Sequence, residues 1–109
     1  MKKLRPRVRA LKLAREVQKR LRQELGQPIQ VILFGSQARG DATKESDIDL
    51  LVVLPTIDVK TTRLASEIAW QVGFDAGRVI SMIPDTKEQM QRYAFLPFYR
   101  NIKQEGIIV

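Results

Sequence analysis

Two apolar segments lie on either side of a short polar loop in the middle of the chain, and this arrangement constrains the fold most. The first segment, residues 29–35, ends in Gly35 before a serine, and the second, residues 47–55, carries Asp47 and Asp49 at its start. Both segments have the length and composition of buried strands. Because the loop is short, we expect the strands to be neighbours, with the glycine and the aspartates at one edge of a sheet.

Helical periodicity surrounds these two strands. In chain order the sequence predicts a basic helix over about 5–25, strands at 29–35 and 47–55, a helix at 58–72, a turn at 73–77, a strand at 78–84, a helix beginning near Asp85 and a last helix from Pro97 to Gly106. Helices alternating with a few strands are typical of an α/β (α+β) fold, in which helices flank a small mixed sheet. We predict a single domain over residues 1–109.

The composition excludes several kinds of site. The chain has no cysteine and no histidine, so neither disulfides nor thiolate or imidazole metal sites are available to it. A metal would bind oxygen ligands, which favours Mg²⁺ or Mn²⁺. No run approaches the roughly 18 apolar residues of a membrane span, and no apolar segment follows the basic N-terminus as in a secretory signal. We expect a cytoplasmic protein without membrane contacts.

Most of the net charge of +7 lies in the first predicted helix. Residues 1–22 hold ten lysines or arginines and one acid, whereas the rest of the chain is slightly acidic. Such a segment can be a solvated helix face, or it can attract phosphates or an acidic partner. If the phosphates belonged to a nucleic acid, the segment would be a nucleic-acid-binding helix. This is the weakest of the interpretations, because no aromatic residues interleave with the charges and no helix-turn-helix motif is visible.

The two aspartates indicate a metal site. Asp47 and Asp49 are two positions apart on a strand, so their side chains point to the same face. Two carboxylates on one face repel each other and are costly to desolvate unless cations neutralise them. Gly35 lets the backbone approach a phosphate, Ser36 offers a hydroxyl and N–H groups, and Arg39 adds positive charge. Together these residues predict a site for a divalent metal and a phosphorylated ligand.

The stretch GSQARGDATKESDIDLLV, residues 35–52, resembles the signature of the DNA polymerase β-like nucleotidyltransferase superfamily. That signature reads Gly-Ser, ten residues, Asp-x-Asp, and here the ten are residues 37–46. The short chain is similar to the minimal nucleotidyltransferases of that superfamily. The α/β pattern extends the resemblance over most of the chain.

The resemblance implies a role for each residue of the motif. Gly35 and Ser36, with Arg39 beside them, would bind a nucleoside triphosphate. Asp47 and Asp49 would be the catalytic residues that ligate Mg²⁺ or Mn²⁺. The implied reaction moves a nucleoside monophosphate, AMP from ATP in the first instance, onto an acceptor hydroxyl and releases pyrophosphate.

A third carboxylate, which active members of the superfamily carry on a later strand, is where this sequence departs from the pattern. The predicted strand 78–84 contains no acid, and the nearest acids are Asp75 before it and Asp85 after it. Asp75 lies in a predicted turn between glycines, where a structural role suits it better. Two functions therefore stay open. The chain is either a Mg²⁺-dependent nucleotidyltransferase or a catalytically weak nucleotide-binding or antitoxin subunit that acts by protein–protein association.

A protein partner is also implied by the resemblance. Many minimal nucleotidyltransferases act with a separate all-helical HEPN protein, as antitoxin to its ribonuclease toxin, and the acceptor is then a tyrosine of the toxin. Exposed apolar side chains would form the partner surface. We predict that Trp70 and Met82 belong to the core, and the cluster 95–99 fits either core or surface.

Overall fold

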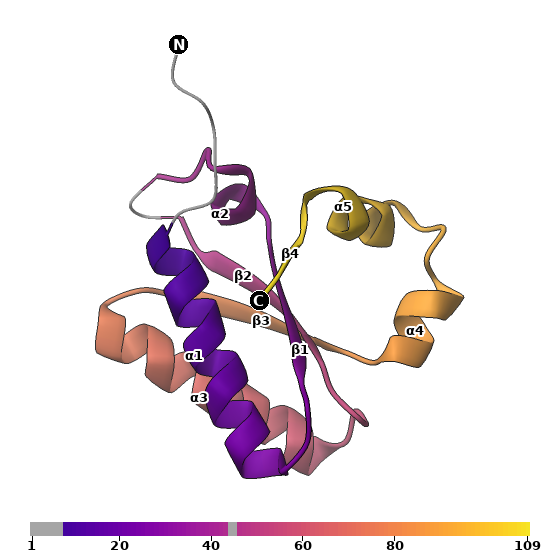
Figure 1. Ribbon diagram of the computed structural model, residues 1–109, viewed down its shortest axis with the longest axis horizontal. Coiled ribbons are helices and arrows are strands. Elements are labelled where there is room, and N and C mark those ends of the chain that lie inside the picture. Colours follow the sequence, from indigo (N-terminus) through magenta and orange to yellow (C-terminus); the bar gives the residue numbers. More distant parts are fainter. Residues whose placement is uncertain (1–7, 44–45) are drawn as a thin grey trace.

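The computed structural model describes residues 8–43 and 46–109, which form a four-stranded sheet with helices around it (Figure 1). In chain order the elements are α1 (Val8–Leu25), β1 (Gln30–Phe34), α2 (Ser36–Arg39), β2 (Ile48–Val53), α3 (Val59–Ala76), β3 (Ile80–Asp85), α4 (Lys87–Arg92), α5 (Pro97–Glu105) and β4 (Ile107–Ile108). The predicted α/β fold with a small mixed sheet is confirmed. The first three residues of the predicted basic helix, 5–7, lie outside the described residues.

The sheet is mixed, with strand order β3-β2-β1-β4. β1 pairs antiparallel with both β2 and β4, whereas β2 and β3 are parallel and are connected by α3. The two strands that flank the polar loop are neighbours, as the sequence predicts, and they form the central pair of the sheet. Their facing ends, the end of β1 and the start of β2, lie at the same edge of the sheet.

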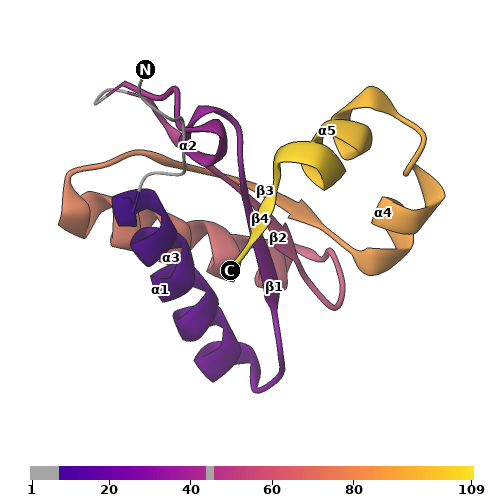
Figure 2. The same ribbon diagram turned by 45° about the horizontal axis from the view of Figure 1, so that its top comes forward.

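One face of the sheet, here called the first face, is covered by α1 and α3, which lie side by side (Figures 1 and 2). α1 buries four residues at helical spacing against it: Ala10, Ala14, Val17 and Leu21. Alternate residues of the central strands meet them, among them Leu33, Leu50 and Val52. The basic side chains of α1 at positions 12, 15, 19 and 22 are exposed on the opposite side of that helix.

The other face, here called the second face, has a smaller apolar cluster. Ile32, Leu51 and Ile102 form it, with Phe34 and Met90 packed against them. Because side chains alternate along a strand, Asp49 lies on the same face as Leu51. The second face is therefore partly covered by α5 and partly left to polar side chains.

The region around residue 73 differs from the prediction. The sequence predicts a turn at 73–77, but α3 continues to Ala76 and ends at Gly77, which has a φ of 66°. Gly73 is buried within α3 and does not end the helix. A glycine is needed there because a Cβ would lie 2.6 Å from the carbonyl oxygen of Arg78. Its role is to let α3 pack closely against β3. From the sequence alone, a glycine with this role cannot be distinguished from a glycine that marks a turn. The predicted cap Asp58 is confirmed, since it accepts from Thr61 N–H.

The elements near the C-terminus also correct the prediction. β3 begins two residues later than predicted and ends at Asp85. Thr86, one residue after the predicted cap, accepts from Gln89 N–H and begins α4. The prediction missed β4, a two-residue strand paired with Ile32 and Leu33. A segment this short has no period of its own, and only its partner strand defines it.

The prediction for Trp70 is wrong. Its side chain is 61% exposed and stacks on Phe74 with ring centroids 4.9 Å apart. α3 turns small residues such as Ala65 and Ala69 to the sheet, and Trp70 lies one position beyond that stripe. Met82 does pack against the first-face core, as predicted. Among the helices of the described residues, none is both long and apolar enough to cross a bilayer.

A buried hydrogen bond between Asp85 and Tyr99 fastens α5 to the end of β3. Asp85 is 2% exposed, and the Tyr99 hydroxyl donates to its Oδ2 over 2.6 Å. Burial, and then the bond to Asp85, raises the pKa of Tyr99 to about 12. The phenol therefore stays protonated and keeps its donor role at any ordinary pH.

We expect Tyr99→Phe to lower the free energy of unfolding by about 2 kcal/mol, because it leaves a buried carboxylate oxygen without its donor. Chemical denaturation measures this loss. Tyr93→Phe is the matched control, since the Tyr93 side chain is exposed. Equal losses in the two variants would contradict the assignment of the bond as stabilising.

Candidate functional site

The site begins where β1 ends in a tight turn. Gly35 has a φ of 75° and a ψ of −157°, a conformation that L side chains rarely adopt. Its carbonyl accepts from the N–H groups of Ala38 and Arg39, which starts the single helical turn α2. The first N–H groups of a helical turn are not used by the helix itself. Those of α2, with the Ser36 hydroxyl, stand at the edge of the sheet that also holds the start of β2.

The register of the sheet fixes which side chains surround Asp49. Asp49 on β2 pairs with Phe34 on β1 and with Ser81 on β3, so all three side chains lie on the second face. A Cβ on Gly35 would lie 2.5 Å from Asp49 Oδ2. The glycine therefore leaves the space that the carboxylate occupies.

Asp47 reaches the same place from just before β2. The hydroxyl of Ser81 donates to its Oδ2 over 3.3 Å. Since Ser81 is also the β3 partner of Asp49, this one serine is a neighbour of both carboxylates. The predicted arrangement of both aspartates at one place is present in the structure.

The electrostatics of the pair show that the two charges oppose each other. Asp49 is half-buried, and burial raises its pKa first, followed by the negative charge of Asp47. The positive charge of Arg39 acts in the other direction. An ionised pair is therefore unfavourable in the protein alone, and a cation placed between the carboxylates would relieve it.

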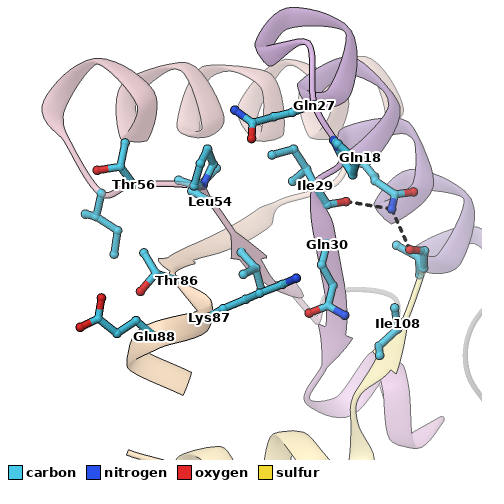
Figure 3. A pocket seen from close by; sticks show the side chains of 15 residues that line it. Gln18, Gln27, Ile29, Gln30, Leu54, Thr56, Thr86, Lys87, Glu88 and Ile108 are labelled. Atoms are coloured by element: carbon cyan, nitrogen blue, oxygen red, sulfur yellow. Dashed lines mark hydrogen bonds between the residues drawn. The ribbon is translucent and has the colours of Figure 1, made fainter. Parts of the chain in front are cut away.

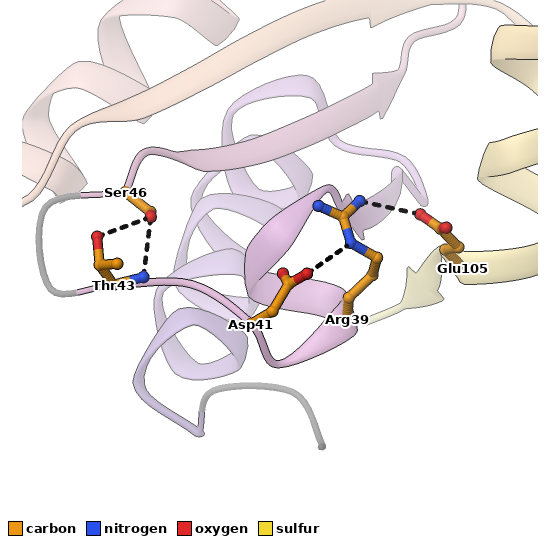
Figure 4. A network of polar contacts seen from close by, with 5 residues as sticks. All are labelled: Arg39, Asp41, Thr43, Ser46 and Glu105. Atoms are coloured by element: carbon orange, nitrogen blue, oxygen red, sulfur yellow. Dashed lines mark hydrogen bonds and ion pairs between the residues drawn. The ribbon is translucent and has the colours of Figure 1, made fainter.

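Arg39 ends α2 and is held by two carboxylates (Figure 4). Its Nε donates to Asp41 Oδ2 over 3.3 Å and its Nη1 to Glu105 Oε2 over 3.2 Å. The bond to Glu105, then that to Asp41, raises its pKa, so it is a permanent cation. Both ion pairs are partly exposed and are individually weak. A phosphate can therefore compete with them for the guanidinium.

The loop that leads to Asp47 is held by its own polar contacts. Thr43 N–H donates to the Ser46 hydroxyl over 3.0 Å (Figure 4). The buried side chain of Gln37 donates from Nε2 to the Ser46 carbonyl over 3.2 Å. Gln37, within the ten-residue spacer of the motif, is thus a positioning residue that the sequence analysis did not single out. Its polar side chain in a short helical turn gave no sign of burial.

Neither of the two acids considered as a third carboxylate is near the pair. Asp75 lies on α3 and accepts from Gln71 Nε2 over 2.8 Å. Asp85 is four residues beyond Ser81 on β3, about 13 Å along the strand at ~3.3 Å per residue. It is occupied by Tyr99 and by Thr86 N–H. Over residues 8–43 and 46–109, no group of three acids could hold a metal.

Ser81 is the residue that the sheet places where a third carboxylate would complete the pair. The strand 78–84 was recognised from the sequence, but only the pairing register of β2 and β3 shows which of its residues faces Asp49. The donor set is then two carboxylates and one hydroxyl, all oxygen. This set fits a hard divalent cation such as Mg²⁺ or Mn²⁺, which accepts carboxylate and hydroxyl or water ligands.

An open cavity of about 660 Å³ lies at the other end of the sheet and is separate from this site (Figure 3). Its lining includes Gln18, whose Nε2 donates to the carbonyls of Ile29 and Val109. Lys87 and Glu88 are the charged residues of its lining. One carboxylate and one ammonium do not make a metal-binding set, so this cavity offers no alternative to the edge with the aspartates as a candidate metal site.

The chain belongs to the nucleotidyltransferase domain family, whose model matches residues 14–109. It is also similar to the protein named "Putative protein adenylyltransferase" in Methanocaldococcus jannaschii. The two are 35% identical over 79 residues, which is 72% of this chain and 75% of that relative. The protein is therefore a transferase enzyme of the nucleotidyltransferase class, with a nucleoside triphosphate as substrate.

We expect Gly35→Ala to abolish nucleotide transfer, because the added methyl group displaces the Asp49 carboxylate. Gly26→Ala is the matched control, since Gly26 has a φ of 67° but nothing within 4 Å of the added Cβ. Backbone strain should lower the free energy of unfolding of both variants by about 1 kcal/mol. Gly35→Ala should lose more than this, because its methyl group also clashes with Asp49. Transfer assays and denaturation curves measure the two effects. Full activity of Gly35→Ala would contradict the close approach.

We expect Asp49→Asn to raise the melting temperature at about pH 7 in metal-free buffer. The pKa of Asp49 is raised in the folded protein. Above this folded-state pKa the ionised carboxylate lowers the stability of the fold, and below the pKa of an aspartate in the unfolded chain this loss of stability disappears. The gain should therefore shrink as the pH falls through the folded-state pKa. Thermal melts of both proteins against pH check this, and a gain that is equal at every pH would contradict it.

Proposed function

We propose that the protein is a Mg²⁺-dependent nucleotidyltransferase that moves AMP from ATP to an acceptor hydroxyl. The observation that carries this proposal is the half-buried Asp49 carboxylate, with Gly35 backbone on one side and Asp47 and Ser81 on the other. An unfavourable pair of like charges beside a turn with free N–H groups suits a metal–triphosphate complex better than any structural role.

Each residue has one task in this reaction. The N–H groups of Ser36 and Gln37 and the Ser36 hydroxyl bind the triphosphate oxygens, and Arg39 exchanges a carboxylate for a phosphate. Asp47 and Asp49 hold the cation, Mn²⁺ being the alternative to Mg²⁺. When bound, the cation neutralises the phosphates and polarises the reacting phosphorus centre. The acceptor oxygen bonds to the α-phosphorus, the bond to the β-phosphate oxygen breaks, and pyrophosphate leaves.

The acceptor we propose is a hydroxyl on a partner protein. Support comes from the name of the archaeal relative, which describes adenylyl transfer to protein. The resemblance to minimal nucleotidyltransferases adds a HEPN-type helical protein as the partner, with this chain as the antitoxin of a cytoplasmic toxin–antitoxin pair. Exposed Phe95, 70% accessible on the connection between α4 and α5, is available for such a contact.

One observation favours the second candidate function, a nucleotide-binding antitoxin subunit with weak catalysis. Ser81 stands where a third acid would serve as general base or second-metal ligand. A serine can bind a metal through its hydroxyl but is not a base at neutral pH. Binding of Mg²⁺ and ATP needs only the pair, so binding can persist where turnover is slow.

Labelled ATP separates these functions. Wild type, incubated with Mg²⁺ and a HEPN-type helical protein as the proposed partner, should release pyrophosphate and label that partner. Asp47→Asn and Asp49→Asn should reduce labelling roughly 100-fold or more. Asp75→Asn, an exposed carboxylate on α3, should keep wild-type labelling. Labelling that survives chelation of the metal, or that Asp75→Asn reduces equally, would contradict the proposal.

Ser81→Asp tests the second candidate. We expect the added carboxylate to tighten Mg²⁺ binding, measured by calorimetry. If wild type binds ATP with Mg²⁺ but transfers nothing, and Ser81→Asp gains transfer, the protein is a binding subunit. If wild type transfers and Ser81→Ala retains the rate within a few fold, the pair alone is sufficient for catalysis.

A further inference from the structure

We propose that Phe98, with Phe34 behind it, forms the subsite that stacks the purine ring of the nucleotide. This inference rests on the proposed function, because it adds a base-binding surface to the same nucleotide site. The subsite takes a planar aromatic heterocycle, and its ligand is a purine nucleoside triphosphate.

The first observation is where Phe34 lies. It is the last residue of β1, directly before Gly35, and it pairs with Asp49 in the antiparallel register. Its ring therefore lies on the second face, beside the aspartates and one residue from the phosphate-binding turn. A group that extends from a bound triphosphate along β1 on this face would meet the Phe34 ring.

The second observation is how Phe98 is presented. Its ring meets Phe34 edge to face, with centroids 5.7 Å apart and planes at 86°. It also meets Tyr99 at 5.2 Å and 85°. The side chain remains 38% exposed. Two perpendicular ring contacts hold the Phe98 side chain in place while part of it stays open to solvent, and a ligand needs such an open surface to stack on it.

The third observation is that α5, which carries Phe98, is fastened at both ends. Near its start Tyr99 donates to the buried Asp85, and at its end Glu105 pairs with Arg39 of α2. Figures 1 and 2 show α5 and α2 on either side of the same end of β1. The helix that supplies the ring is thus connected to the turn that supplies the phosphate contacts. A pre-positioned ring costs less ordering entropy on binding.

Stacking also predicts which nucleoside triphosphates should bind most tightly. A base that stacks on an aromatic ring gains about 1–3 kcal/mol, and every base has a π-face. Purines have the larger face, so ATP and GTP should bind alike and more tightly than CTP and UTP.

The competing role for Phe98 is to dock α5 on the sheet. The buried contact of Ile102 with Ile32 and Leu51 already does this. Phe98→Leu distinguishes the two roles, because leucine keeps apolar contact with Phe34 but has no π-face. Phe98→Trp keeps the π-face and enlarges it. Phe95→Leu is the control, an aromatic residue that is more exposed than Phe98 and lies before α5.

Calorimetry with Mg²⁺ present should compare ATP with inorganic tripolyphosphate, which has no base. We expect Phe98→Leu to weaken ATP binding roughly tenfold and to leave tripolyphosphate binding and the melting temperature unchanged. Phe98→Trp and Phe95→Leu should bind ATP as wild type does.

The outcomes separate this inference from the proposed function. Wild type that binds ATP no more tightly than tripolyphosphate overturns the base subsite and leaves the triphosphate site standing. Equal weakening of both ligands by Phe98→Leu assigns Phe98 a structural role and also overturns the subsite. Wild type that binds neither ligand overturns the proposed function, and the subsite with it.

Discussion

The arrangement of the site depends on the repulsion between two carboxylates that the backbone holds close together. Asp49 is fixed by pairing on both sides of β2, and Asp47 is tied to Ser81 of the neighbouring strand. Sheet pairing therefore fixes the backbone from which both carboxylates extend. Burial, and then the negative charge of Asp47, raises the pKa of Asp49. Gly35 leaves room for the Asp49 carboxylate. The positive charge of Arg39 partly offsets the negative charge of the pair.

The two faces of the sheet divide stability from function. The first face buries a continuous apolar core under α1 and α3, and it includes the largest set of fully buried side chains. The second face has a small cluster of three buried residues, and its remaining area holds the aspartates, Ser81 and the aromatic rings. Because the first face supplies most of the burial, the second can keep polar and unfavourable groups. β2 contributes to both, through alternate residues.

The features predictable from the sequence were the local ones. Hydrophobic runs predict β1 and β2, and the Gly-Ser and Asp-x-Asp spacing predicts that Gly35 and Asp49 lie at one edge of the sheet. What failed depends on tertiary contacts. Gly73 serves helix–strand packing, Trp70 points away from a core it was expected to join, and β4 exists only by pairing with β1. The partners of Arg39 and the position of Ser81 follow from the register, which no single-strand pattern encodes.

Ser81 shows why binding and turnover are separate demands on this site. Two carboxylates carry two negative charges, and one divalent cation neutralises them completely. A third acid would leave a net negative charge that a second cation could balance, whereas a hydroxyl adds a ligand without adding charge. With serine at this position, a second cation would depend on the oxygens of the triphosphate itself. In the proposed reaction, affinity for the metal–nucleotide complex would therefore rest on Asp47 and Asp49. The rate would rest on whatever accepts the proton of the acceptor hydroxyl, a task for which Ser81 has no basic group.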